Sequence, residues 1–351
     1  MTKPTLSLII PALNETKIIM PNVHELQAWM TENLPDISYE VIVVNDGSTD
    51  GMGEMLEEEC KNNSKLRVLH HRTNIGRGRA VRTGIENTQS DYLITLDADL
   101  SYSPDHIKPL LEPLMAGRTD LTLASPYHAS GVVENVPTFR AWLSKWGNRV
   151  LSGAFESKAK TVTCIVRGYT RDLMDHLELV NNGKDFHLEV LYKTELLGFR
   201  VEEVPAKLIW RDKNRGRVKQ HHGNIITRNS LYRMRRSIFS HLVFNFFSRP
   251  QLLFILPMLI LLGFIIFGTA NIVFVWVELI NSGQSIMSAL RTALLDGQLT
   301  LQIVAGSTIL FFTLMLFFFL ASQSKKYFEE LYTQNARINV RLKRLQKSED
   351  N

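Results

Sequence analysis

The sequence has few cysteines, and the apolar runs in about its first 230 residues are short. The two cysteines, Cys60 and Cys164, lie far apart and do not form the closely spaced set that a disulfide framework requires. This pattern excludes a disulfide-stabilised secreted domain and favours a reducing, cytosolic location for the polar part of the chain. Residues 1–15 contain only a short apolar run followed by charge, so they predict a first β-strand rather than a secretory signal peptide.

Charged residues are missing from two long stretches near the C-terminus. Residues 252–277 contain none, and residues 299–321 form a second such run. Each stretch exceeds the roughly 20 residues that a helix needs to cross about 30 Å of hydrocarbon. The sequence therefore predicts two transmembrane helices joined as a hairpin.

Lysine and arginine are scarce between these two stretches. Residues 278–298 contain one, Arg291, whereas residues 211–249 contain ten and residues 322–351 contain seven. Because Lys and Arg near membrane ends stay cytoplasmic, both termini and the polar part are predicted on the cytoplasmic side of an inner or plasma membrane. Residues 228–249 interleave arginine with aromatic and aliphatic side chains, which indicates an interfacial helix rather than a nucleic-acid patch.

The C-terminal tail carries an apolar repeat at the spacing of a coiled coil. Its members are separated by three and four residues in alternation, with asparagine at one core position: Phe328, Leu331, Asn335, Ile338, Leu342 and Leu345. The pattern favours either a self-associating coiled coil or an amphipathic helix packed on the membrane or on the polar domain.

Strand and helix patterns alternate through the first 130 residues. Apolar runs such as LSLIIP and YEVIVVN are followed by stretches with helical periodicity, which predicts an α/β fold with a mostly parallel sheet and helices on both faces. In such sheets ligands bind beyond the carboxyl ends of the strands. The polar residues that follow the predicted strands are therefore site candidates: Pro11, Asn14, Glu15, Asp46, Asp97 and Asp99.

Two carboxylates one residue apart, Asp97 and Asp99, end the apolar run at residues 92–96. Asp99 alone is explained as a helix cap, and Asp46 alone as a turn residue. The pair resists this explanation because two nearby negative charges repel. A divalent cation on carboxylate oxygens, with open positions left for substrate phosphates, removes the repulsion.

The glycine-rich segment NIGRGRA, residues 74–80, is a further candidate for phosphate binding. It lacks the spacing of both the dinucleotide fingerprint G-x-G-x-x-G and the Walker motif. The sequence therefore disfavours an oxidoreductase with a bound dinucleotide.

Four motifs together resemble one family. LIIPALNE, VIVVNDGSTDG, NIGRGRA and the D-x-D motif in LDADL are similar to those of the GT-A glycosyltransferases of family 2, and within it to membrane-anchored polyprenyl-phosphate glycosyltransferases. The resemblance covers about residues 5–230 and implies a Rossmann-like GT-A catalytic domain at 1–227. An interfacial helix at 228–249, a transmembrane hairpin at 252–321 and a basic tail at 322–351 would follow.

The resemblance also implies roles for individual residues. Mg²⁺ or Mn²⁺ would bind at Asp99 and Asp97, which with Arg140 are the predicted catalytic residues. The acceptor phosphate would contact Arg140, Ser144 and Arg167. The nucleotide sugar would contact a larger set: Pro11, Asn14, Glu15, Asp46, Gly76, Arg79, Asp97 and Lys219.

The implied reaction is inverting transfer of a sugar from a nucleotide-diphosphate sugar, with a UDP-sugar favoured and GDP-mannose as the alternative, to a polyprenyl phosphate. The implied partners are donor, lipid acceptor, membrane and a second copy of the chain. Five positions depart from the family pattern: Ser101 where relatives often carry Gln, Pro126 in place of Arg, Thr161 in place of an acid, Lys213 in place of Arg and Val218 in place of Ser. A processive polysaccharide synthase is disfavoured because Q-x-x-R-W is missing, and a non-catalytic membrane scaffold because the D-x-D motif is intact.

Overall fold

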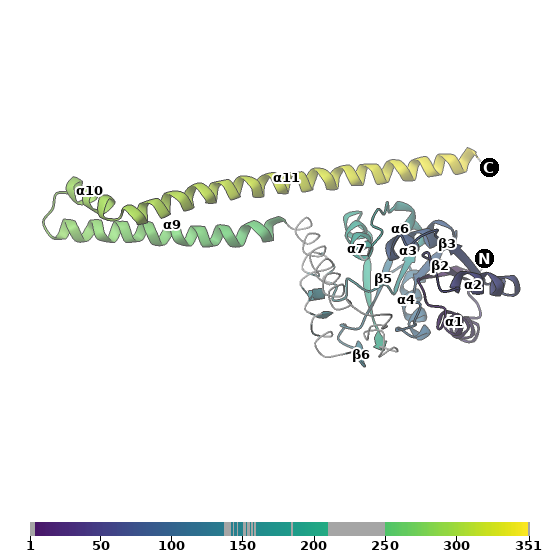
Figure 1. The fold of residues 1–351 in the computed structure, drawn as a ribbon. Helices are drawn as coiled ribbons and strands as arrows, with labels where there is room; N and C mark the ends of the chain where they lie inside the picture. The colour runs from purple at the N-terminus through teal and green to yellow at the C-terminus, as the bar shows by residue number, and fades with distance from the viewer. Residues whose placement is uncertain are drawn as a thin grey trace. The chain divides into compact units, whose positions relative to one another are not determined.

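The computed structural model describes residues 4–136, 142, 144–145, 147–149, 152, 155, 157, 159–183, 185–209 and 250–349. Within these residues, seven strands form one sheet in the order β3-β2-β1-β4-β7-β5-β8 (Figure 1). Their bounds are β1 Thr5–Ala12, β2 Ser38–Asn45, β3 Leu66–His70, β4 Tyr92–Thr95, β5 Leu121–Ser125, β7 Arg167–Thr170 and β8 Val201–Pro205.

The sheet is mostly parallel, as the strand–helix alternation predicts. Strand β1 pairs in parallel with β2 and β4, β2 with β3, and β5 with β8. Strand β7 differs, because it runs antiparallel to both of its neighbours, β4 and β5. A separate parallel pair joins β6 (Val132–Glu134) to β9 (Lys207–Ile209).

Helices cover both faces of the sheet. The register aligns Ile9 with Thr95 and Thr95 with Arg167, so these side chains share one face, whereas Gly168 belongs to the other. Helix α3 (Arg77–Glu86) packs on the first face through Gly84, and α4 (Ile107–Met115) packs on the second against Gly168. The remaining helices are α1 Ile19–Asn33, α2 Met52–Asn62, α6 Arg171–His176, α7 Phe186–Leu196 and a 3₁₀ turn at Pro104–His106. The central strands are accordingly buried on both sides.

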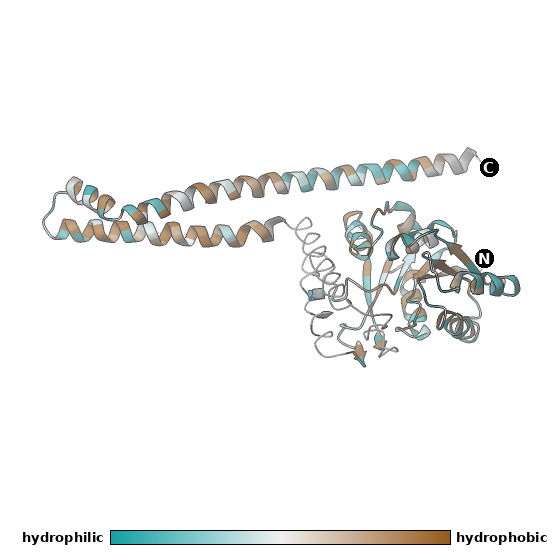
Figure 2. Ribbon diagram, in the orientation of Figure 1, coloured by the Kyte–Doolittle hydropathy of each residue, from teal (hydrophilic) through white to brown (hydrophobic). Residues whose placement is uncertain are grey.

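A second compact unit comprises Leu242–Leu331, while Met1–His241 and Tyr332–Asn351 belong to the first. The second unit contains α9 (Pro250–Asn281), α10 (Ile286–Asp296) and the start of α11 (Gln298–Glu349). Helices α9 and α11 are long and apolar enough to cross a membrane, and Figure 2 shows that the apolar residues of α11 give way to polar ones toward its C-terminus. The predicted spans at 252–277 and 299–321 thus fall inside helices that extend further.

Helix α10 was not predicted, because the stretch 278–298 was treated only as a connection. Its first turn is capped by Ser285, whose hydroxyl accepts the N–H of Ser288. Ala289 and Ala293 are buried, and Trp276 donates its indole N–H to the carbonyl of Ile286 at 3.1 Å.

The C-terminal part of α11 has one exposed apolar side and one buried side. Leu331, Ile338 and Leu342 of the predicted heptad seam are each at least half exposed, whereas Tyr332 and Ala336 are buried. The hydroxyl of Tyr332 bonds to the backbone of Glu178, so the part of α11 from Tyr332 onward packs within the first unit. The predicted interfacial helix at 228–249 lies outside the described residues.

Candidate active site

A cavity of about 280 Å³ lies at the carboxyl ends of β1, β2 and β4. Its wall includes four of the residues that sequence analysis selected, from three separate strand ends. The lining residues are Pro11, Ala12, Leu13, Glu15, Asp46, Asn74, Arg77, Ala80, Asp97 and Ala98. This is the position at which open α/β sheets bind ligands.

Asp46, directly after β2, is buried and organises the glycine-rich segment. Its two carboxylate oxygens accept the backbone N–H groups of Ile75 and Gly76, each at 2.9 Å. Oδ1 also lies 2.8 Å from Nδ1 of His71, and Nε2 of His71 lies 3.0 Å from the hydroxyl of Thr83. Gly76, predicted to contact the nucleotide sugar, is not among the lining residues, and its N–H is bonded to Asp46.

Asn14 joins the loops that follow β1 and β2. Its backbone N–H donates to the hydroxyl of Ser48, and its side-chain oxygen accepts the N–H of Thr49, both at 2.9 Å. A φ of 56° places Asn14 in the left-handed region, which asparagine tolerates better than most residues. Asn14 therefore holds the rim together.

The cationic residue at the cavity is Arg77, which sequence analysis missed. Its guanidinium lies 3.8 Å from the carboxylate of Asp97. The predicted Arg79 is two residues further along α3 and pairs instead with Glu86, at 3.2 Å. The signal lay within the R-G-R sequence, where only the position of the helix start decides which arginine faces the strand ends.

Asp99, the second carboxylate of the predicted metal motif, lies in a tight turn. Its Oδ1 accepts the backbone N–H of Ser101 at 3.1 Å and the hydroxyl of Ser101 at 2.5 Å. Ser101 also accepts, through its carbonyl, the N–H of Ile209 in β9 at 2.9 Å. Ser101, where relatives often carry glutamine, thus orients Asp99 and ties its loop to β9.

The protein oxygens at this edge of the sheet are too few to hold a hard divalent cation by themselves, so a bound ligand would have to supply the remaining oxygens. Among the described residues, no group of three or more His, Cys, Asp or Glu side chains is arranged to hold a metal. Asp97 and Asp99 supply carboxylate oxygens, which Mg²⁺ prefers together with substrate phosphates. The residues present fit a cation shared with a bound diphosphate.

Arg167, predicted to contact the acceptor phosphate, is the first residue of the inner strand β7 and is fully buried. Its Nε, Nη1 and Nη2 donate to the carbonyls of Cys164, His187 and Val162, at 2.8, 2.8 and 2.6 Å. Burial lowers the pKa of Arg167 from its usual value. The guanidinium is thereby fixed in the interior and does not line the cavity.

The other predicted acceptor residues are only partly visible. Ser144 is exposed, and its carbonyl accepts the side-chain N–H of Asn148 at 3.0 Å. Arg140 and the predicted donor residue Lys219 lie outside the described residues.

A carboxylate lies next to Thr161, where relatives often have an acid. Glu203 of β8 accepts the backbone N–H of Thr161 at 2.8 Å, and the hydroxyls of Thr161 and Ser125 lie 2.7 Å apart.

The buried Cys164 is not a candidate nucleophile. Burial raises the pKa of its thiol to about 11, so the thiol stays protonated at neutral pH.

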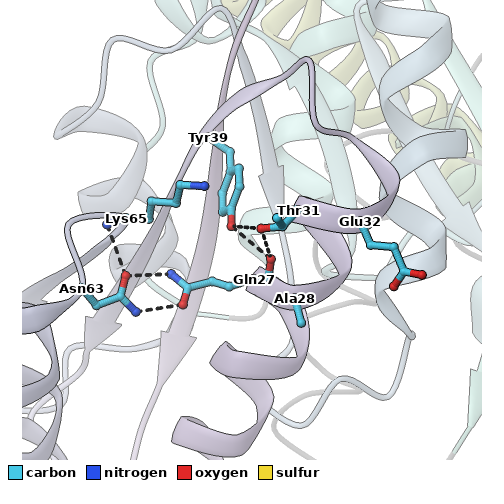
Figure 3. A pocket seen from close by; sticks show the side chains of 7 residues that line it. All are labelled: Gln27, Ala28, Thr31, Glu32, Tyr39, Asn63 and Lys65. Atoms are coloured by element: carbon cyan, nitrogen blue, oxygen red, sulfur yellow. Dashed lines mark hydrogen bonds between the residues drawn. The ribbon is translucent and has the colours of Figure 1, made fainter.

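A larger depression of about 460 Å³ lies elsewhere, beside α1 and the start of β2 (Figure 3). Several of its polar groups are hydrogen-bonded to one another. The amides of Gln27 and Asn63 exchange hydrogen bonds of 3.2 and 2.8 Å, and Tyr39 donates to the carbonyl of Gln27 at 3.1 Å. Since these groups already have partners, the depression offers a ligand little, and the strand-end cavity remains the candidate site.

Comparison with known proteins finds one family model and several relatives. The model of glycosyl transferase family 2 matches residues 7–177. The chain is 29% identical over 213 residues to the polyprenol monophosphomannose synthase of Mycolicibacterium smegmatis, covering 56% of this chain and 78% of that protein. It is 29% identical over 214 residues to the undecaprenyl-phosphate mannosyltransferase of Micrococcus luteus, covering 58% and 83% respectively.

Two further proteins match either over a smaller share of their own length or at lower identity. The glycosyltransferase AglD of Haloferax volcanii is 26% identical over 214 residues, which is 60% of this chain but about a third, 34%, of that protein. The structure of glucosyl-3-phosphoglycerate synthase from Mycobacterium tuberculosis with Mg²⁺ and UDP aligns with a TM-score of 0.48 at 19% identity, over 69% of this chain and 79% of that one.

Proposed function

From the premise that residues 7–177 form a glycosyl transferase family 2 domain, we propose that the protein transfers a sugar from a nucleoside-diphosphate sugar to a polyprenyl phosphate. The observation that carries the proposal is the cavity at the carboxyl edge of the sheet. Its lining includes Asp46, Arg77 and Asp97, the first carboxylate of the D-x-D motif. Two relatives named for polyprenol-phosphate products support the acceptor class.

The donor occupies the cavity between the ends of β1, β2 and β4. Pro11, Glu15 and Asp97 form its wall, and Asp46 and Asn14 fix the loops around it. Lys219 would close the site from a segment outside the described residues. Both named relatives act on or produce a mannose compound, so a nucleoside-diphosphate mannose becomes the first donor to test, ahead of the UDP-sugars that sequence analysis favoured.

A Mg²⁺ or Mn²⁺ ion bound by Asp99 and Asp97 would neutralise the diphosphate as it leaves. Arg77 is placed to share that task, since its guanidinium is 3.8 Å from Asp97. Ser101 holds the carboxylate of Asp99 in a single orientation.

The reaction is one displacement with inversion at the anomeric carbon. An oxygen of the acceptor phosphate forms the new bond to that carbon, and the bond from the carbon to the diphosphate oxygen breaks, its electron pair leaving with the nucleoside diphosphate. A phosphate monoester is substantially ionised at neutral pH, because its second pKa is about 6. The nucleophile needs no strong general base, which is consistent with a threonine at position 161.

The acceptor phosphate contacts Arg140 and Ser144 in this proposal. Arg167, which sequence analysis also assigned to the acceptor phosphate, has a structural role in this proposal. With its three donor groups bonded to backbone carbonyls, Arg167 acts as a positioning residue under the site.

The two apolar helices associate the enzyme with the membrane that holds its acceptor. We place both termini and the catalytic domain on the cytoplasmic side, because Lys and Arg are concentrated on both flanks of the hairpin. The exposed heptad seam of α11 supports a homo-oligomer joined through the tail.

The test is a transfer assay with the full-length chain in detergent or nanodiscs. Nucleoside-diphosphate sugars, labelled in the sugar, are incubated with polyprenyl phosphate and Mg²⁺ or Mn²⁺, and lipid-linked product is measured. We expect one sugar per lipid and loss of product with Asp99→Asn, whereas the exposed-site variant Asp36→Asn stays active. Failure with every donor, or an unaffected Asp99→Asn enzyme, contradicts the proposal and favours a non-catalytic protein. Polymer on the lipid would instead indicate a processive enzyme.

A further inference from the structure

The start of α3, which carries Arg77 to the cavity, is held by a backbone carbonyl. The oxygen of Asn182 accepts the N–H groups of Gly78 and Arg79, at 2.8 and 3.2 Å. These are among the free amides that a helix N-terminus offers to an anion. Here they are already bonded, so the glycine-rich segment is a docking point for residues 181–183 rather than a phosphate cradle.

The two glycines of this segment are required by that close approach. A Cβ on Gly76 would lie 2.4 Å from the carbonyl oxygen of Asn182. A Cβ on Gly78 would lie 2.7 Å from the carbonyl oxygens of Asn181 and Gly183. Backbone atoms cannot move aside as a flexible side chain can, so any side chain here would push α3 and the 181–183 segment apart.

A buried ion pair on α7 fixes the other side of the same segment. The carboxylate of Glu189 accepts the N–H groups of Val180 and Asn181, at 2.9 and 2.8 Å. Lys193 donates to Glu189 at 2.6 Å and to the carbonyl of Glu178 at 2.5 Å. With both side chains about nine-tenths buried, this pair depends on complete hydrogen bonding to be stable.

The ion pair is covered by α11. The ring of Tyr332 lies 4.8 Å from the ammonium of Lys193, within cation–π range, and its hydroxyl accepts the N–H of Glu178 at 3.2 Å. Further toward the C-terminus of α11, the side chain of Asn339 donates a hydrogen bond to the carboxylate of Glu178. Tyr332 is only 9% exposed.

We propose that Tyr332 is a positioning residue for donor binding, acting through Lys193 and Glu189 on the carbonyl of Asn182 and hence on Arg77. Tyr332 contacts Lys193, and Lys193 contacts Glu189, which holds the N–H groups of Val180 and Asn181. The carbonyl of the next residue, Asn182, holds the N–H groups of Gly78 and Arg79, directly after Arg77 in the chain. The donor site is therefore completed by residues that follow the apolar part of α11 in the chain. The inference rests on the proposed function for the identity of the ligand, a nucleoside-diphosphate sugar.

The test compares three variants of the full-length protein. Tyr332→Ala removes both the ring over Lys193 and the acceptor for Glu178, whereas Tyr332→Phe keeps the ring. Tyr327→Ala is the matched control, because Tyr327 lies on the same helix and is 64% exposed. Donor KM, kcat and amide hydrogen exchange of residues 76–82 and 178–183 are measured for each.

We expect Tyr332→Ala to raise donor KM about 5- to 10-fold, the effect of losing one or two hydrogen bonds, with kcat at saturating donor changed less than twofold. Exchange in both segments should accelerate. Tyr332→Phe should fall between wild type and Tyr332→Ala, and Tyr327→Ala should match wild type.

Two results overturn the inference. In the first, Tyr332→Ala changes neither the donor KM nor the hydrogen exchange of the two segments. In the second, Tyr332→Ala lowers kcat by about 5- to 10-fold and leaves the donor KM unchanged. Neither result affects the proposed function, because wild-type transfer activity is measured in the same assay. Conversely, if wild type transfers no sugar, the exchange experiment still decides whether Tyr332 holds residues 76–82 in place.

Discussion

The carboxylate of Asp46 lies 2.8 Å from the imidazole of His71 while the same carboxylate accepts the N–H groups of Ile75 and Gly76. Asp46 was predicted to contact the nucleotide, and it lines the cavity at the strand ends. Asp46 also has a structural role, because its hydrogen bonds hold residues 75–76 against the end of β2.

Asp46→Asn tests this structural role. The amide has one acceptor oxygen and points an N–H₂ group at a backbone donor, which leaves a buried group unsatisfied at about 1–3 kcal/mol. We expect a fall in thermal midpoint of several degrees and weaker donor binding, measured by differential scanning fluorimetry and titration. Asp36→Asn, at an exposed position, is the control. A midpoint equal to wild type would show that the bonds from residues 75 and 76 contribute nothing.

The two neighbouring arginines of α3 make a matched pair of variants. Arg77 lines the cavity near Asp97, whereas Arg79 pairs with Glu86. Arg77→Ala should raise donor KM by about tenfold or more, because a hydrogen bond to a charged group is worth about 1.5–3 kcal/mol. Arg79→Ala should stay within about twofold of wild type. Steady-state kinetics with varied donor distinguishes them, and the reverse order would restore the assignment of Arg79 to the site.

Stability should depend on pH through His187. Burial, and then the guanidinium groups of Arg167 and Arg77, hold the pKa of His187 well below its usual 6.5. Within the described residues neither ring nitrogen has a hydrogen-bond partner. In the unfolded chain His187 gains a proton below about pH 6.5, whereas the folded protein keeps it neutral, so the stability present above that pH is lost as pH falls.

The loss amounts to at most about 1.4 kcal/mol per pH unit for one group. His187→Leu should therefore flatten the decline in thermal midpoint between pH 6.5 and 5. Parallel curves for wild type and His187→Leu would mean that His187 binds its proton in the folded state.

The exposed seam of α11 tests self-association. Ile338 is 52% exposed and sits at a core position of the heptad pattern. Ile338→Asp would place like charges in the seam of an oligomer and should shift the particle mass in nanodiscs or detergent to that of a monomer. Gln334→Asp, outside the core positions, should leave the mass unchanged. An unchanged mass for Ile338→Asp would show that the tail does not join copies.

The alternation of short strands with helices was enough to predict the sheet and the edge at which polar residues gather. Parallel strands place their carboxyl ends together, so Glu15, Asp46 and Asp97 could be assigned to one site without knowing a single contact. The two apolar helices followed from length and composition alone, because few other structures accommodate more than 20 uncharged residues.

The contacts that set the details join residues far apart in the chain. The carbonyl of Asn182 meets the amide of Gly78 about a hundred residues away, and nothing in either local pattern indicates the other. The choice between Arg77 and Arg79 depends on the residue at which α3 begins, which is the least certain property of a predicted helix. Helix α10 was missed since a short amphipathic helix gives a weak signal between two strong ones.

Arg167 carries its charge in the interior, and the three carbonyl oxygens that receive its hydrogen bonds have no net charge of their own. It pairs through the backbone with Thr95, two residues before Asp97. Mobile ions screen a buried charge much less than an exposed one. The attraction of this strand edge for phosphate groups should therefore persist at ionic strengths that abolish the contribution of surface arginines.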